Sequence, residues 1–164
     1  GGGWGAADGF DAVAWDPDSV RVARGVFGAS LLYPVGIQQC PLDEIDRVTT
    51  WMAGESAGQC GPCVFGLPSV SDDVHQLAVG SAGDEDMDRL NRRLGLIVNR
   101  GGCKHPDGTA RFVATGLSVF ADEVALHLER RCSAGDRSHG DHATALPVPT
   151  ARLALVDVGS RDFE

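Results

Sequence analysis

The feature that most constrains the fold is the spacing of apolar residues between positions 41 and 131. Apolar side chains recur there every three or four residues, and this spacing places them on one face of an α-helix. Glycine-containing turns divide the region into four segments. Their apolar stripes consist of Leu42, Ile45, Val48, Thr49 and Met52, of Val70, Val74 and Leu77, of Met87, Leu90, Leu94 and Val98, and of Val113, Leu117, Phe120, Val124 and Leu128. Four amphipathic helices joined by short loops predict a helical bundle.

The ends of these helices are marked by proline, acidic residues and glycine. Pro41 suits the first position of a helix, and Asp43 and Glu44 follow in the first turn, where the helix dipole favours anions. Gly54 marks the end of this helix. We expect the other three helices to run from residue 69 or 71 to 80, from 84 to about 99, and from about 108 to 131.

The segments on either side of the bundle differ from it in composition. Residues 20–24 and 29–35 are short apolar stretches near turn residues, which predicts strands. Residues 133–150 are rich in Gly, Ser, His, Asp and Pro and predict a linker, and residues 152–158 predict a final strand. The expected fold class is therefore α+β, mainly α. Its expected parts are a β-rich segment over 1–40, a four-helix bundle over 41–132, and a linker with a C-terminal strand over 133–164.

Composition argues against two kinds of partner. The 164-residue chain has a formal net charge of −9, and nucleic-acid binding needs clustered Lys and Arg, so no nucleic acid is expected. No apolar run is long enough to span a bilayer, so direct membrane insertion is not expected. Five cysteines are an odd number and do not resemble a disulfide framework. We expect a reducing, cytoplasmic setting, which includes the cytoplasmic side of a membrane-associated complex. The chain begins with glycine, and whether it is a fragment of a longer protein stays open.

Three of the cysteines have a spacing typical of metal ligands. Cys60 and Cys63 are separated by two residues, which lets two thiolates bind one centre, and Cys103 follows about forty residues later. Both segments contain glycine and follow predicted helices, so helix ends at the same level of a bundle can bring them together. Cys40 and Cys132 stand apart from this pattern. A packed or free thiol is the simplest interpretation of each, and we prefer it for Cys132.

Three chemistries compete for these thiols, beside a chance occurrence of the close pair. An iron–sulfur cluster takes about four ligands, usually cysteines. Zinc could take Cys60, Cys63, Cys103 and His105, although the single residue between the last two is unusual spacing for a tetrahedral site. Cys60-Gly61-Pro62-Cys63 is also the active-site tetrapeptide of thioredoxins. A thioredoxin fold places that pair after an apolar strand, whereas a helix is expected to precede it here.

The segment Glu55–Cys63 resembles the Glu-Ser-Cys-Gly-x-Cys-x-Pro-Cys segment of the NADH-binding, flavin-bearing component of bacterial NADH–quinone oxidoreductase, and of related hydrogenases and formate dehydrogenases. That family has its fourth cysteine about forty residues later, which Cys103 matches. The resemblance covers about residues 29–131. It implies a four-helix domain that holds a 4Fe–4S cluster and receives electrons from a flavin. Residues 1–40 would then correspond to part of the preceding SLBB-like β-grasp region.

One departure from the family concerns the cluster ligands. The first cysteine of the family falls on Ala57, as in an actinobacterial-type branch that the chain resembles. The resemblance then implies cofactor and metal binding by Cys60, Cys63 and Cys103, with a 4Fe–4S cluster or, if one iron is lost, a 3Fe–4S cluster. Cys40 lies about 17 mostly helical residues before Ala57, or roughly 20–25 Å away. The fourth ligand therefore stays open among Cys40, Ser56, His105, Asp107, a partner residue and none.

A second departure concerns the flavin. Nothing in the chain resembles a Gly-x-Gly-x-x-Gly nucleotide loop between a strand and a helix, so FMN and NADH are expected only on another chain or a missing domain. We expect an electron-transfer domain of a flavin-linked oxidoreductase, with flavin-bearing and ferredoxin-type subunits as partners and no NADH oxidation of its own. The alternative is a structural or assembly module with zinc or no metal at the cysteines. No catalytic residue is expected, and the four scattered histidines are expected at the surface or at helix caps: His75, His127, His139 and His142.

Overall fold

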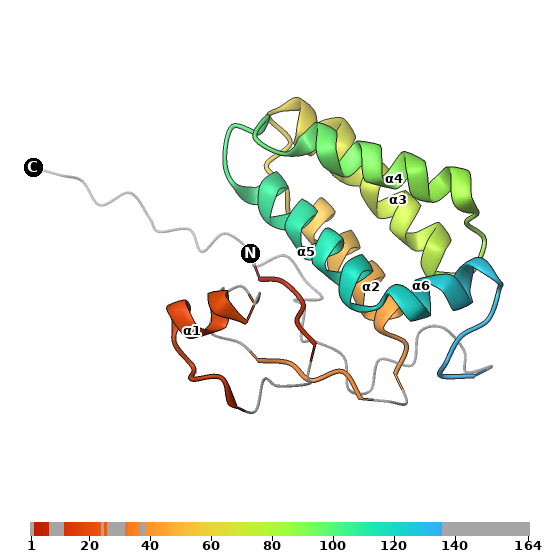
Figure 1. Ribbon diagram of the computed structural model, residues 1–164. Helices are drawn as coiled ribbons and strands as arrows, with labels where there is room; N and C mark the ends of the chain where they lie inside the picture. Colours follow the sequence, from red (N-terminus) through yellow and green to blue (C-terminus); the bar gives the residue numbers. More distant parts are fainter. Residues whose placement is uncertain (1, 7–11, 24, 26–31, 37–38, 136–164) are drawn as a thin grey trace, which may run out of the picture.

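The computed structural model describes residues 2–6, 12–23, 25, 32–36 and 39–135, and this part of the chain is mainly helical (Figure 1). It contains no strand among the described residues. The elements are α1 (Pro17–Val22), α2 (Pro41–Gly54), the π-helical turn η2 (Pro62–Gly66), α3 (Leu67–Ala78), α4 (Asp84–Ile97), α5 (His105–Val119) and α6 (Ala121–Leu128). The predicted helical bundle is confirmed.

The bundle is a closed arrangement of four long helices. Helix α2 packs against α3 and α5, α3 packs against α4, and α4 packs against α5, so each long helix has two neighbours. Helix α6 continues from α5 and covers the end of the bundle where α2 begins and α3 ends (Figure 1). The bundle therefore has two ends, and each end collects loops from several elements.

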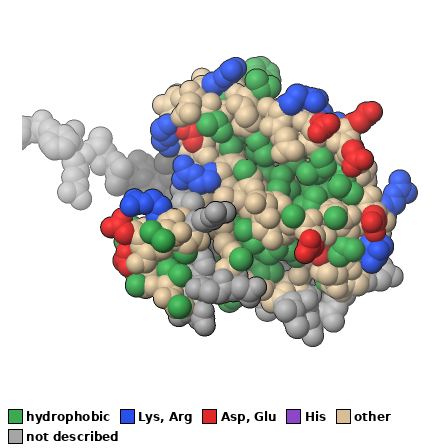
Figure 2. Space-filling model, viewed as in Figure 1, with side chains coloured by type: hydrophobic (Ala, Val, Ile, Leu, Met, Phe, Trp, Pro, Cys, Tyr) green, Lys and Arg blue, Asp and Glu red, His purple; other side chains and the backbone are tan. Residues whose placement is uncertain are grey.

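The surface of the bundle is mixed in character. Figure 2 shows apolar side chains grouped on the face presented in Figure 1, with most of the visible Lys, Arg, Asp and Glu side chains around its edge. The large exposed apolar residues of the described chain include Val64 and Phe65 on η2 and Leu96 and Val98 at the end of α4. None of the helices in the described ranges combines the length and the apolarity needed to cross a membrane.

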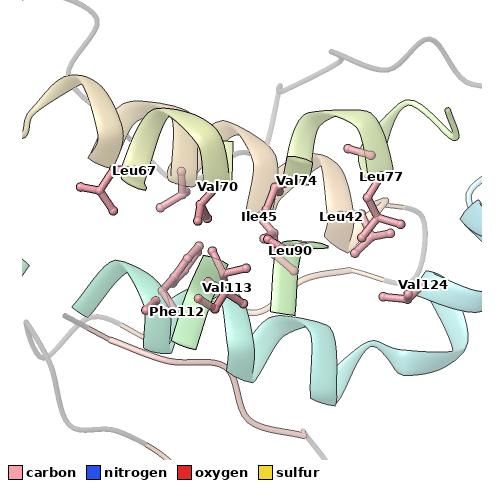
Figure 3. Close-up of a cluster of buried hydrophobic side chains, with 14 of the residues drawn as sticks. Leu42, Ile45, Leu67, Val70, Val74, Leu77, Leu90, Phe112, Val113 and Val124 are labelled. Atoms are coloured by element: carbon pink, nitrogen blue, oxygen red, sulfur yellow. The ribbon is translucent and has the colours of Figure 1, made fainter. Parts of the chain in front are cut away.

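The core consists of the apolar stripes of the four long helices (Figure 3). Ile45 of α2, Val70 of α3 and Val113 of α5 are fully buried, and Leu90 of α4 is 1% exposed. Burying each such side chain contributes about 1.5–3 kcal/mol relative to leaving it in water. The predicted stripes of α2 and α3 are confirmed except that Met52 is only partly buried. The prediction for Val98 is wrong.

The apolar stripe predicted for the third helix ends at Val98, one residue after the last buried residue of that helix. Val98 is 39% exposed, and Ile97 is buried in its place. Helix α4 ends at Ile97, and the extended backbone of Val98 turns its side chain out of the helical face. Ile97 instead packs so closely on η2 that a methyl group added at Gly66 would lie 2.4 Å from its Cγ2 atom. Glycine at position 66 therefore allows α4 to approach the π-helical turn.

Two predicted helix starts are wrong by a few residues. The second helix begins at Leu67, directly after η2, and not at residue 69 or 71. Pro68 has no N–H for the carbonyl four residues earlier, so a regular α-helical ladder is interrupted there, and the wider π-helical turn precedes it. The fourth predicted helix begins at His105 and is divided in two at Phe120. The ring of Phe120 packs edge-on against Trp4 at the point of the break.

The segment before the bundle does not form the strand predicted over residues 20–24. Pro17–Val22 is helical because Asp16 caps the first turn, where its carboxylate accepts hydrogen bonds from the N–H groups of Asp18 and Ser19. Local capping and Pro17 outweigh the apolar alternation that suggested a strand. In the other predicted strand, residues 32–35 are described and are not in a strand. Most of the predicted linker and all of the final strand lie outside the described residues.

The amino-terminal segment is held against α5 by one aromatic residue. The backbone N–H of Trp4 donates to Oγ1 of Thr115. The Trp4 ring contacts the rings of Phe112 and Phe120 at centroid distances of 5.4 and 5.3 Å. A methyl group at Gly116 would lie 3.0 Å from the Trp4 ring and 2.6 Å from Ile45. Glycine at this position lets α5 approach both α2 and the amino-terminal segment.

A buried carboxylate connects α3 to α4. The side chain of Asp73 is 2% exposed, and it accepts hydrogen bonds from Arg89 at 2.8 Å and from Arg93 at 2.6 Å. The two guanidinium groups remain about one-third exposed, so the ion pairs cost less desolvation than a fully buried set. Hydrogen bonds that involve charged groups are the strong ones, so Asp73 is expected to fix the packing of α3 on α4.

Replacing Asp73 with alanine tests this connection. We expect Asp73→Ala to lower the free energy of unfolding by about 2 kcal/mol, because three charged hydrogen bonds to two arginines are lost while both arginines can still reach water. Urea unfolding followed by circular dichroism measures the change. Asp72→Ala is the matched control, since Asp72 is exposed on the same helix and should change stability little. Equal effects of the two substitutions would contradict the role of Asp73.

Candidate functional site

Two cysteine-containing loops meet at one end of the bundle. The first lies between α2 and η2, and the second lies between α4 and α5 (Figure 1). The backbone N–H of Gly102 in the second loop donates to the sulfur of Cys60 in the first. Cys63 and Cys103 are close enough to interact electrostatically. Residues more than forty positions apart in the sequence therefore place three thiols in one region, which we call the cysteine end.

The close pair is shaped by the π-helical turn. Cys60 precedes η2, and its carbonyl oxygen accepts the N–H groups of Cys63 and Val64 at 3.0 and 2.9 Å. Cys63 lies within η2 and is 4% exposed, whereas Cys60 is half-buried. Gly58 has a φ of +64°, a left-handed conformation that glycine adopts readily, so the chain turns sharply between Ala57 and Cys60. Short-range backbone geometry thus brings the Cys60 sulfur within reach of Gly102.

The second loop is closed by Asp107 near the start of α5. One carboxylate oxygen accepts the N–H of Asn99 at 2.7 Å, and the other accepts Lys104 Nζ at 2.8 Å. Lys104 also donates to Oδ1 of Asn99. These contacts hold the ends of the loop together and hold the pKa of Asp107 below its usual value, mainly through Lys104. A methyl group at Gly101 would lie 2.9 Å from the Cys103 carbonyl oxygen, so this tight loop requires glycine there.

The two thiols of the close pair differ in acidity. Backbone N–H groups of Gly102 and Cys63 donate to the Cys60 sulfur and hold the pKa of Cys60 below its ordinary value, because they favour the thiolate. Burial raises the pKa of Cys63, and the neighbouring Cys60 sulfur adds to the effect. The hydrogen bonds that unite the two loops therefore also prepare Cys60 to act as a thiolate, the form in which cysteine binds metals.

The residues considered for a fourth ligand differ in their positions and in their hydrogen-bond partners. His105 lies two residues after Cys103, and its Nε2 is 2.8 Å from the carbonyl oxygen of Met52. That contact requires the proton on Nε2 and leaves Nδ1 as the nitrogen that can bind a metal. Ser56 and Ala57 lie in the loop before Cys60. Both carboxylate oxygens of Asp107 accept hydrogen bonds from Asn99 and Lys104, so the carboxylate stabilises the loop.

Cys40 is not at the cysteine end. It is the N-cap residue of α2, and its sulfur lies 3.4 Å from Nε2 of His127 on α6. Helix α2 has 14 residues and is therefore about 21 Å long, which separates Cys40 from the loop that follows α2. The structure thus removes Cys40 from the candidates for the fourth ligand and groups it with Cys132, Glu123 and His127.

The carbonyl oxygen of Leu77 at the end of α3 lies 3.1 Å from Nδ1 of His127, so the predicted helix-capping role is confirmed. The alternative surface position predicted for His127 is wrong. Its side chain is 1% exposed, because α6 places it on the same face as Val124, which packs in the core. The sequence signal that could have revealed it is the spacing of Glu123 and His127, four residues apart on a predicted helix. By contrast, His75 is exposed as predicted and contacts Asp46 at 2.8 Å. His139 and His142 lie outside the described residues.

Comparison with known proteins identifies the family of this chain. The family described as the NADH-ubiquinone oxidoreductase-F iron-sulfur binding region matches residues 43–127, which is more than half of the chain. The chain belongs to this family. The matched region includes all three thiols of the cysteine end, Cys60, Cys63 and Cys103. The resemblance predicted from the cysteine segments is therefore confirmed.

Two curated relatives illustrate how much of a longer protein the chain resembles. The F subunit of NADH-quinone oxidoreductase of Mycobacterium tuberculosis (strain ATCC 25618 / H37Rv) is 28% identical over 117 residues, which are 71% of this chain and 26% of the relative. The protein of the same name in Streptomyces coelicolor is 27% identical over 119 residues, which are 73% of this chain and 26% of the relative. The chain spans about a quarter of the length of the curated relatives that it matches.

The difference in acidity between the two thiols can be measured on the reduced, metal-free chain. We expect the pH midpoint for alkylation of Cys60 to lie below that of Cys63, because a lower pKa leaves more thiolate at a given pH. Mass spectrometry of the alkylated peptides measures both rates. Gly102→Pro removes the N–H that donates to Cys60 and should raise the Cys60 midpoint, whereas the matched Gly102→Ala keeps the N–H and should not. Identical midpoints in both variants would contradict the assignment.

Proposed function

We propose that this chain is an electron-transfer domain of a flavin-linked, NADH dehydrogenase-like oxidoreductase and that Cys60, Cys63 and Cys103 bind its iron–sulfur cluster. The observation that carries the proposal is the hydrogen bond from Gly102 to Cys60, which joins the two cysteine loops. This contact lies inside the region that belongs to the iron–sulfur binding family. Such a cluster would accept and release single electrons when bound.

The residues at the cysteine end fit such a group in their chemistry. Thiolates are the usual ligands of iron–sulfur clusters, and three of them come from two adjoining loops. Methyl groups added at Gly61 or Gly102 would meet no atom within 4 Å, so there is open space beside the thiols. The fit is incomplete by one ligand, because alanine occupies position 57.

The fourth position is assigned by elimination to groups near the cysteine end. Cys40 and Asp107 are engaged elsewhere, which leaves His105, Ser56, a side chain of a partner, or no ligand. His105 is the candidate that the geometry favours, since the hydrogen bond to the Met52 carbonyl leaves its Nδ1 able to bind a metal. The leading proposal is a 4Fe–4S cluster with a fourth ligand. If the three thiolates are the complete ligand set, the cluster is instead of the 3Fe–4S type.

The protein groups around the thiols would influence the ease of reduction. Backbone N–H groups that donate to sulfur stabilise extra negative charge, so the donation from Gly102 to Cys60 favours the reduced state. Cys63 is buried, whereas Cys103 is exposed. The domain therefore combines a sheltered ligand with one at the surface, as electron exchange with another protein requires.

Two observations support the proposed partners: exposed apolar residues near the cysteine end, and the family to which the relatives belong. The exposed apolar residues near the cysteine end lie on two elements that contact each other, and they are Val64 and Phe65 of η2, Leu96 of α4, and Val98 directly after α4. Exposed apolar groups of this kind are typical of surfaces that pack against another protein. We propose that a flavin-bearing chain or domain supplies electrons and that a ferredoxin-type subunit receives them. FMN and NADH would then bind outside this chain. The chain itself would have three parts, over residues 1–40, 41–132 and 133–164.

Substitution of the three thiols tests the proposed ligands. We expect the anaerobically prepared chain to contain iron and acid-labile sulfide and to give an electron paramagnetic signal in one of its redox states. Cys60→Ser, Cys63→Ser and Cys103→Ser should each remove most of the iron, because a hard oxygen replaces a soft thiolate. Cys132→Ser is the control and should keep its iron. Stoichiometric zinc at the cysteine end without sulfide would instead favour the structural or assembly module.

A second test concerns Ala57. Ala57→Cys adds a thiol three residues before Cys60, in an exposed loop whose turn is made by Gly58. We expect it to raise the iron content per chain and to slow the loss of the cluster in air, because a fourth thiolate completes the ligand set. The matched control is Gln59→Cys, which adds a thiol to the same exposed loop at another position. Equal behaviour of both variants would mean that a native fourth ligand already exists, and His105→Ala then becomes the informative variant.

A further inference from the structure

A second group of metal-binding side chains lies at the other end of α2. It consists of Cys40 before α2, Glu123 and His127 on α6, and Cys132 after α6. One ligand atom from each of the four residues lies within 4.8 Å of all the others. We propose that these residues form a structural zinc site, separate from the cysteine end and independent of the proposed electron transfer.

The distances match those of a tetrahedral metal site. Cys40 Sγ is 3.4 Å from Nε2 of His127, and the same nitrogen is 3.2 Å from Oε1 of Glu123. Bond lengths of about 2.0–2.3 Å to zinc place neighbouring tetrahedral ligand atoms about 3.3–3.8 Å apart. Cys132 completes the group, since its thiol is within hydrogen-bond reach of both Cys40 and Glu123. The four ligand atoms are thus arranged around a common centre.

The hydrogen bond made by the other ring nitrogen of His127 orients the imidazole for metal binding. Nδ1 lies 3.1 Å from the carbonyl oxygen of Leu77 at the end of α3. A carbonyl oxygen only accepts, so Nδ1 carries the proton, and this assignment follows from the partner. Nε2 is then the ring nitrogen that can bind a metal, and it faces Cys40 and Glu123. Protein zinc sites commonly hold a ligating histidine through such a contact on its second nitrogen.

The local structure around α6 explains how the ligands converge. Glu123 and His127 are four residues apart and so lie on the same face of the helix. The helix then ends in a reversal in which Arg130 has a φ of 60° and the N–H of Arg131 donates to the carbonyl of Leu126. This reversal returns the chain toward α6, and the N–H of Ser133 donates to Oε1 of Glu123 at 3.0 Å. Cys132 is held beside Glu123 as a result.

Burial makes this group unusual for a cluster without a cation. Glu123 is 7% exposed, Cys40 is 8% exposed and His127 is 1% exposed. Burying a carboxylate beside two sulfurs and the lone pair of an imidazole is costly unless a positive charge lies between them. A zinc ion supplies that charge to a mixed nitrogen, sulfur and oxygen set, and four protein ligands leave no open coordination position. Such a closed site would tie the start of α2 to α6 and to the segment after it.

Zinc binding by the complete chain tests the proposal. The metal-free, reduced chain is titrated with zinc against a chromophoric chelator, and bound zinc is counted by elemental analysis. We expect one zinc per chain in the wild type and in a triple variant that replaces the cysteine end, Cys60→Ser, Cys63→Ser and Cys103→Ser. Loss of a hydrogen bond to a zinc ligand typically lowers the affinity for the metal by about 10–100-fold. Cys132→Ser removes a ligand itself and should therefore lower the zinc affinity by more than this. Circular dichroism checks that each variant is folded.

Cobalt substitution of the triple variant, in which Cys40 and Cys132 are the remaining cysteines, provides a second measurement. A tetrahedral cobalt ion at this site should show visible ligand-field bands and a charge-transfer intensity that corresponds to two thiolates. Absence of these bands in the triple variant would overturn the proposal. Zinc binding that is lost in the triple variant and kept in Cys132→Ser would place the metal at the cysteine end and would also overturn it. Absence of tight zinc binding in the wild type would also overturn it, and the four side chains would then be a metal-free hydrogen-bonded group.

Discussion

The structure depends on the burial of α2 between α3 and α5. Its inner face, with Leu42, Ile45 and Thr49 almost completely buried, is in contact with the helices that lead to every loop of interest. Because α2 is a straight connection of about 21 Å, it fixes the distance between its two ends. The packing that stabilises the bundle therefore also determines that Cys40 and Cys60 belong to different sites.

At the cysteine end, the positions of the thiols follow from backbone constraints. The π-helical turn, the tight loop at Gly101 and the carboxylate of Asp107 each act on a few neighbouring residues. The contact between Gly102 and Cys60 then joins two loops that are already shaped. Organisation of this kind reduces the reordering that binding of a cofactor would require, and ordering a loop on binding is a main cost of affinity. The geometry is thus consistent with a rigid site for electron transfer, which works best when little rearranges.

Much of this arrangement was predictable from the sequence, and the errors have physical causes. The apolar stripes located the long helices because burial of a continuous face dominates over local preferences. The strand predicted over 20–24 failed because a capping carboxylate at Asp16 acts within one turn, and alternation over five residues is a weak signal. The start of α3 was missed because a π-helical turn has no apolar period of its own. For the cysteine end, the motif indicated which residues to consider, but only the fold shows that Gly102 reaches Cys60.

The group at Cys40 shows why a buried polar site is harder to predict than a motif. Its ligands come from three separate places in the sequence, and only Glu123 and His127 are related by a helical spacing. Taken one at a time, a lone cysteine and a helical histidine have ordinary explanations as packed or surface residues. What distinguishes them is convergence: three buried donors and the partly buried Cys132 lie around one point, with His127 held by the Leu77 carbonyl. The two ends of the bundle have no ligand in common, and a helix length separates them, so substitutions at one end should act independently of the other. A metal at the Cys40 group would then stabilise the contact between the start of α2 and α6, without taking part in the proposed electron transfer.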